Sequence, residues 1–90
     1  MKDNTLMIHP RDNVVVALKA LTAGDMVTAN GIEAFKAIDN IPVSHKIAVR
    51  DILCGEEIIK YGETVAVSTQ IIKKGQWVHT QNLESKRWKK

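Results

Sequence analysis

The chain has 90 residues, with 13 Lys and Arg against 10 Asp and Glu, and 44% of its residues are hydrophobic. This length allows one domain with a single core, and no apolar run approaches the roughly 18 residues that cross a membrane. Polar residues and a proline interrupt the start too early for a signal peptide, so we expect a cytoplasmic protein without a membrane partner. Cys54, the single cysteine, excludes an internal disulfide and a thiolate metal cluster.

The net charge of +3 is concentrated at one end of the chain. The last five residues, KRWKK, hold four of the 13 basic residues, which leaves nine basic against ten acidic residues elsewhere. Nucleic-acid binding needs basic side chains gathered on a folded face, whereas a short basic end is more often solvated. We therefore divide the chain into a folded domain at 1–85 and a basic tail at 86–90, and expect no nucleic-acid partner.

Three segments align without gaps on a glycine: VVALKALTAGDMV at 15–27, KIAVRDILCGEEI at 46–58 and AVSTQIIKKGQWV at 66–78. Each has an apolar residue three positions before the glycine and another three positions after it. The alternation predicts a strand, a tight turn and a strand, that is, three copies of one hairpin. Gly24, Gly55 and Gly75 are expected to supply the positive φ that such turns require.

The segment between the first two copies, GIEAFKAI, has marginal helical spacing and predicts one helical turn around 32–37. The first copy is rich in good helix formers, but it aligns with a segment of β-branched residues, and this alignment favours strands in both. The sequence thus predicts a mainly β, pseudo-repeated single domain. Neither a βαβ unit nor a phosphate-binding glycine loop is present.

Each of the three histidines lies at the end of a copy: His9 before the first, His45 before the second and His79 after the third. Strand ends often carry binding groups, because the scaffold fixes them and leaves them accessible. If the copies stack about a pseudo-symmetric core, His9, Asp12, His45 and His79 converge at one mouth suited to a divalent metal. The alternative is that they are surface or capping residues, since no HxH or HExxH spacing occurs and Asp12 can close a local turn.

The remaining candidates have structural explanations. Lys60 and Tyr61 stand in a turn, KYGE, where the lysine is expected in water. Trp77 is expected in the core or in an interface, and Trp88 lies in the basic tail, disordered or as an anchor for a partner. Cys54 has no neighbouring histidine or aspartate pattern that would activate it as a nucleophile.

Three stretches, HPRDNVVVAL, IPVSHKIAVRDILCGEEIIKYGE and IIKKGQWVHTQN, together resemble the N-terminal SAF-type domain of the altronate and galactarate dehydratases. The resemblance covers about residues 8–83, and its most specific pieces are DNV at 12–14, HK at 45–46, DI and GE within 51–56, IKYG at 59–62 and VH at 78–79. It implies a β-clip fold similar to type III antifreeze protein. It also implies a lyase that removes water from a sugar acid to give a 2-keto-3-deoxy acid.

The resemblance implies roles by position, in three groups: catalytic His45 and Lys46, substrate-binding Lys60 and Tyr61, and metal-associated His9, Asp12 and His79. The catalytic pair would face the substrate carboxylate or act in proton transfer. The metal would be iron, manganese or magnesium and would be supplied mainly by the complex. Because the chain ends soon after the module, we expect a separate small subunit that docks on a large dehydratase subunit and is inactive alone.

Three positions depart from the family pattern. The family usually has glycine where Ser44 and Ala66 stand, which predicts altered loop geometry, and it has histidine where Gln81 stands, which removes a possible metal ligand or proton carrier.

Other functions stay open. A similar small subunit serves the sulfolactate sulfo-lyases, which expel sulfite, and Lys46, Arg50 and Lys60 would supply the cationic groups for that chemistry. A non-catalytic carbohydrate- or anion-binding module is a further alternative, and a nucleic-acid binder that depends on residues 86–90 is the last.

Overall fold

The computed structural model describes residues 3–85, and over this range it contains nine short strands and no helix. The strands are β1 Thr5–Leu6, β2 Val14–Ala17, β3 Met26–Val27, β4 Phe35–Lys36, β5 Lys46–Ala48, β6 Glu57–Lys60, β7 Glu63–Ser68, β8 Trp77–Val78 and β9 Leu83–Ser85. The predicted mainly β single domain is confirmed. No helix in this range is long and apolar enough to span a membrane. The predicted basic tail at 86–90, with Trp88, lies outside the described residues.

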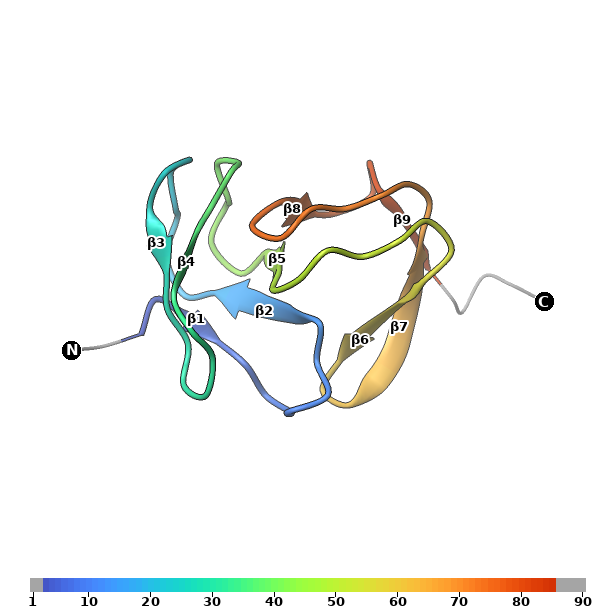
Figure 1. Cartoon of the computed structure of the whole chain (residues 1–90), viewed down its shortest axis with the longest axis horizontal. Coiled ribbons are helices and arrows are strands. Elements are labelled where there is room, and N and C mark those ends of the chain that lie inside the picture. Colours follow the sequence, from blue (N-terminus) through green and yellow to red (C-terminus); the bar gives the residue numbers. More distant parts are fainter. Residues whose placement is uncertain (1–2, 86–90) are drawn as a thin grey trace.

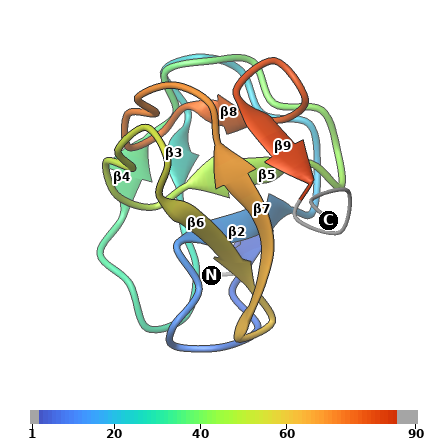
Figure 2. The ribbon, with the colours of Figure 1, turned by 90° about the vertical axis from the view of Figure 1, so that its right-hand side faces the viewer.

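Three antiparallel sheets follow one another along the molecule (Figure 1). The two-stranded β3–β4 sheet lies at one end, the four-stranded sheet in the order β1–β2–β5–β8 lies in the middle, and the three-stranded β6–β7–β9 sheet lies at the other end. In Figure 2 this last sheet stands in front of β2 and β5. The buried side chains between them include Val14, Ala48 and Ile58.

The helical turn predicted around 32–37 is wrong, because this segment contains β4. Phe35 and Ala37 are buried while Lys36 between them is exposed, which is the two-residue period of a strand. β4 pairs with β3, with Val27 opposite Phe35. The weak helical spacing was therefore overridden by tertiary packing of alternate residues.

Each of the three predicted turns forms, with its glycine at positive φ. The φ angles are 97° at Gly24, 85° at Gly55 and 90° at Gly75, as a type II turn requires at its third residue. In each turn the side chain after the glycine folds back and accepts a hydrogen bond from the backbone N–H of the first residue. These bonds join Asp25 to Thr22 (2.8 Å), Glu56 to Leu53 (2.9 Å) and Gln76 to Lys73 (2.8 Å).

The strands on either side of these turns do not pair with each other, so the hairpin prediction is wrong. β2 pairs with β1 and β5, whereas β3, on the other side of the first turn, pairs with β4. Each turn carries the chain from one sheet to another. Local alternation specifies a strand but not its partner, which depends on long-range packing.

A fourth copy of the unit, which the alignment on glycines misses, runs from residue 35 to residue 47. FKAIDNIPVSHKI aligns without gaps with the other three copies and is buried at the equivalent apolar positions. Ser44 takes the place of the glycine, with a φ of 71°. His45 donates its backbone N–H to the Pro42 carbonyl (3.2 Å) and so closes the same turn.

The four copies form two pairs. The copies at 15–27 and 35–47 pair through a bridge between Leu21 and Ile41, and those at 46–58 and 66–78 pair through a bridge between Ile52 and Ile72. Each pair supplies most of one core cluster. The first cluster is Val15, Ala17, Leu21, Val27, Ala29, Phe35, Ala37, Ile41 and Ile47. The second is Val14, Ala48, Ile52, Ile58, Ala66, Ile72 and Val78.

Candidate anion-binding site

Two of the three histidines meet at the edge where β5 pairs with β8. Lys46 lies opposite Val78 in this ladder, so His45, just before β5, and His79, just after β8, are brought side by side. Their ring centroids are 4.7 Å apart. The sequence prediction that histidines at the ends of the copies converge therefore holds for this pair.

Trp77 joins both imidazole rings. Its indole Nε1–H donates to Nδ1 of His45 at 3.1 Å, and its ring lies nearly parallel to that of His79, with 5.3 Å between centroids and an interplanar angle of 5°. Trp77 is half-buried against the first core cluster, as expected of a core residue. Its contact with His45 was missed, because sequence spacing does not show which ring an indole N–H reaches.

Lys46 places a half-buried ammonium beside the histidine pair. Burial lowers the pKa of Lys46, and the positive charge of Lys60 lowers it further. The ion pairs within residues 3–85 are Arg50–Glu56 and Lys73–Asp51, so neither Lys46 nor Lys60 forms an ion pair with a carboxylate of the described residues. Two like charges held together without a counterion favour binding of an anion.

The same surroundings disfavour protonation of His79. Burial lowers the pKa of His79, and the neighbouring His45 and Lys46 lower it further. Its backbone N–H donates to the Asn82 side chain at 3.0 Å, which fixes the turn that carries the ring. In the described part of the chain, its two ring nitrogens have no hydrogen-bond partner. The ring thus keeps a free nitrogen lone pair near neutral pH.

Lys60 and Tyr61 lie at the β6–β7 turn. The Lys60 ammonium stands 4.9 Å from the centroid of the Tyr61 ring, a cation–π distance. Tyr61 is exposed and has a φ of 59°, and Gly62 follows it at 77°. The positive charge of Lys60 acts on Lys46, so the two ammonium groups lie near each other; the substrate-binding role that the resemblance implies for Lys60 and Tyr61 stays a prediction.

His9 and Asp12 have structural partners of their own. The Asp12 carboxylate accepts hydrogen bonds from the backbone N–H groups of His9 (3.1 Å) and Gly62 (2.8 Å). Nδ1 of His9 accepts from the backbone N–H of Arg11 at 3.1 Å, and a Cβ on Gly62 would come within 2.9 Å of the His9 ring. These contacts tie the turn at residues 9–12 to the β6–β7 turn.

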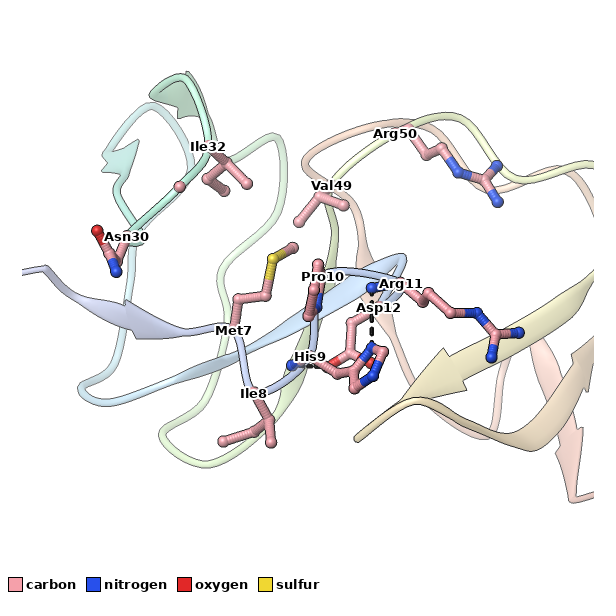
Figure 3. Close-up of a pocket in the computed structure, with 11 residues that line it drawn as sticks. Met7, Ile8, His9, Pro10, Arg11, Asp12, Asn30, Ile32, Val49 and Arg50 are labelled. Carbon is pink, nitrogen blue, oxygen red and sulfur yellow. Dashed lines mark hydrogen bonds between the residues drawn. The ribbon is translucent and has the colours of Figure 1, made fainter.

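His9 and Asp12 also line a cleft of about 560 Å³ (Figure 3). Met7, Ile32 and Val49 supply apolar walls, and the guanidinium groups of Arg11 and Arg50 extend on one side of it. His45 and His79 do not line this cleft. The histidines are therefore divided between two places, and the predicted single mouth is not formed.

The predicted metal set does not fit this chain. No three His, Cys, Asp or Glu side chains among residues 3–85 come together as metal ligands. Both Asp12 oxygens are already bound to backbone N–H groups, and in the described residues the His9 ring is not among those that contact His45 or His79. A bound metal ion would need at least some of its ligands from outside the described residues.

The departures from the family pattern have different outcomes. Ser44 occupies the left-handed region that favours glycine, which explains why glycine is usual at this position. Ala66 is buried inside β7 without positive φ, so the expected change of loop geometry does not occur there. Gln81 donates its side-chain N–H to the Trp77 carbonyl at 3.3 Å and so braces the turn after β8.

Fold and site together define a small all-strand module that presents cationic and imidazole groups at one edge. Residues 3–86 match the family described as the altronate/galactarate dehydratase SAF domain, and the chain belongs to this family. The recognition made from the sequence motifs is confirmed.

The similar curated proteins are lyases of two kinds. The chain is 34% identical over 89 residues to (2R)-sulfolactate sulfo-lyase subunit alpha of Chromohalobacter salexigens, covering 91% of this chain and 95% of that subunit. It is 32% identical over 80 residues to altronate dehydratase of Bacillus subtilis, covering 89% of this chain and 16% of that enzyme. It is 31% identical over 80 residues to galactarate dehydratase (L-threo-forming) of Escherichia coli, covering 81% of this chain and 14% of that enzyme. The chain thus spans about a sixth of the dehydratases and nearly all of the sulfo-lyase subunit.

Proposed function

We propose that the chain is the small, SAF-type subunit of a cytoplasmic sugar-acid dehydratase of the altronate or galactarate type. It acts with a large catalytic subunit and has little or no activity alone. The observation that carries this proposal is the pair of neighbouring ammonium groups of Lys46 and Lys60 beside two imidazole rings. Family membership supplies the class of reaction.

The charges suit the carboxylate of a sugar acid. Lys46 is half-buried and repelled by Lys60, and a bound carboxylate between them relieves the repulsion while it gains two charge-assisted contacts. The same charges stabilise the negative charge that develops on the carboxylate when the neighbouring carbon loses its proton. His45 and His79 stand beside this position with ring nitrogens that accept or donate hydrogen bonds.

The reaction is an elimination of water. A base removes the proton α to the carboxylate, and its C–H electron pair becomes the new carbon–carbon double bond. The bond from the β carbon to its hydroxyl breaks with both electrons on oxygen, which takes up a proton and leaves as water. The resulting enol rearranges to the 2-keto-3-deoxy acid. Lysines 46 and 60 hold the anion in this scheme, and the large subunit completes the acid–base groups.

Co-expression tests this proposal. The chain is co-expressed with a candidate large subunit of the altronate or galactarate dehydratase type, and the purified pair is supplied with altronate, galactarate and related acids. A 2-keto-3-deoxy product that requires both subunits supports the proposal. Absence of product from every acid contradicts it. Binding of the acids to the small chain alone, without turnover by the pair, indicates an anion-binding module instead.

A sulfo-lyase subunit is the second candidate, and the alignment over 95% of the Chromohalobacter subunit favours it. The leaving group is then sulfite, which departs with the electrons of the carbon–sulfur bond. The same two lysines would hold a substrate that carries both a carboxylate and a sulfonate, whereas Arg50 is ion-paired with Glu56 and lines the separate cleft beside His9 and Asp12. Release of sulfite from sulfolactate by the assembled pair distinguishes this function from dehydration.

A further inference from the structure

His45 occupies a position whose side chain closes the turn in the other three copies of the unit. There the equivalent side chains are those of Asp25, Glu56 and Gln76, and each accepts a hydrogen bond from the first backbone N–H of its turn. In the fourth copy the first residue of the turn is Pro42, which has no N–H to donate. The imidazole of His45 is therefore not used to close its own turn.

Trp77 holds this imidazole instead. Its indole N–H donates to Nδ1 of His45 at 3.1 Å. Trp77 is itself fixed at both ends of its backbone: its N–H donates to the Asp39 carboxylate at 2.9 Å, and its carbonyl accepts from the Asn82 side chain at 2.8 Å. The stack on His79 fixes the plane of the indole. The indole N–H of Trp77 therefore points at Nδ1 of His45.

An indole N–H donates and never accepts a hydrogen bond. Nδ1 of His45 must therefore carry a lone pair, and the ring proton of the neutral imidazole must lie on Nε2. Adding a proton to this ring requires Nδ1 to give up the Trp77 contact. Losing the Nε2 proton would leave an imidazolate. Nδ1 is therefore engaged by Trp77 and is not free to accept a proton, and Nε2 keeps its proton because an imidazolate is too strong a base to form near neutral pH.

We propose that Trp77 is a positioning residue that holds His45 as its neutral Nε2–H form, so that His45 serves the bound anion as a hydrogen-bond donor and does not transfer protons. This deepens the proposed function and rests on it where the bound anion is the substrate. The alternative role of His45 in proton transfer, which the family resemblance left open, is excluded by this inference. His79, whose ring nitrogens have no partner in the described chain, remains available for that role.

The arrangement is tested first on the 90-residue chain alone. Nitrogen-15 NMR of the histidine side chains reports which ring nitrogen carries the proton. In the wild type at pH 7.5 to 8 (about one unit or more above an ordinary histidine pKa), His45 should show a protonated Nε2 and an unprotonated Nδ1. In Trp77→Phe, which keeps an aromatic ring against His79 but lacks the N–H, both nitrogens should move toward the averaged positions of an exchanging mixture.

Two outcomes of the NMR experiment overturn the inference. One is a proton on Nδ1 of His45, or a mixture of both forms, in the wild type. The other is an unchanged His45 pattern in a folded Trp77→Phe variant, with folding judged from its backbone amide spectrum. If that variant does not fold, the wild-type NMR pattern and the activities of the His45 variants still test the inference.

The donor role is tested on the assembled lyase with two substitutions. His45→Gln places an amide N–H near the position of Nε2–H but cannot act as a base, whereas His45→Ala removes the donor. Loss of such a donor costs about 10²–10³-fold in kcat, so we expect this loss in the alanine variant and less than a tenfold loss in the glutamine variant. Equal losses in both variants would overturn the inference.

Failure of this inference and failure of the proposed function are distinguishable. The NMR experiment needs neither substrate nor partner, so it decides the Trp77–His45 arrangement even if no sugar acid is turned over. Conversely, an active dehydratase with His45 protonated on Nδ1 would leave the proposed function standing and remove the role assigned to Trp77.

Discussion

Replacing Ser44 with glycine should raise the stability of the domain. Ser44 has a φ of 71°, and a side chain in this left-handed region costs about 1–2 kcal/mol. Glycine removes that cost, but the greater freedom of the unfolded chain offsets about 0.5–1 kcal/mol of it. The Ser44 hydroxyl makes no hydrogen bond within residues 3–85, so nothing else is lost. The midpoints of these ranges give an expected net gain of about 0.75 kcal/mol, or roughly 3–6 °C in Tm for a domain of this size.

Urea unfolding measures this gain, and the paired copy provides the matched control. Gly24 occupies the equivalent position at a φ of 97°, and an added Cβ meets no atom within 4 Å. Gly24→Ser should therefore lose stability by a similar amount, through conformation alone. If Ser44→Gly leaves the free energy of unfolding unchanged or lowers it while Gly24→Ser is destabilising, the equivalence of the four turns is refuted.

Three further predictions concern charge, pH and packing. Lys46→Met should raise the free energy of unfolding at pH 7, because burial and Lys60 both disfavour the Lys46 ammonium; a decrease in urea unfolding would contradict this. The pKa of His79 lies below its ordinary 6.5, so on acidification the unfolded chain takes up this proton before the folded chain does. The free energy of unfolding should therefore fall as the pH drops below about 6.5. His79→Gln should make this fall shallower, and an equally steep fall in the variant would contradict the prediction. Gly75→Ala should lower the free energy of unfolding by about 3 kcal/mol or more, because a Cβ at residue 75 would lie 2.4 Å from the Lys36 carbonyl oxygen. Gly24→Ala, which meets no such atom, should lower it by only about 1 kcal/mol. Equal losses of stability in thermal unfolding would contradict this prediction.

The turns could be predicted from sequence because their chemistry is local. Gly24, Gly55 and Gly75 mark positions of positive φ that few other residues adopt. The pairing of the strands could not be predicted, because it depends on contacts between distant segments. The fourth copy escaped detection since Ser44 stands where the other copies have glycine, although the spacing of Ala37, Ile41 and Ile47 carries the signal.

Only part of the candidate site could be predicted for a similar reason. His45 and His79 were placed together by the rule that copies of one unit share their ends. His9 follows the same rule in sequence, but Asp12 ties its turn to Gly62 in the β6–β7 turn. The rings that contact His45 in the described residues are those of Trp77 and His79, and His9 is not among them. The contact from Trp77 to His45 depends on ring orientation, which no spacing rule specifies.

The most direct test of the site is the activity of the assembled lyase after removal of one charge. Lys46→Met removes the half-buried ammonium, and Lys73→Met is the control, because Lys73 is an exposed lysine paired with Asp51. We predict that kcat/KM for the sugar acid, or for sulfolactate, falls at least about 100-fold in the first variant and stays within about twofold of the wild type in the second. An assembled enzyme that keeps its full kcat/KM without the Lys46 ammonium would contradict the placement of the substrate anion at this edge.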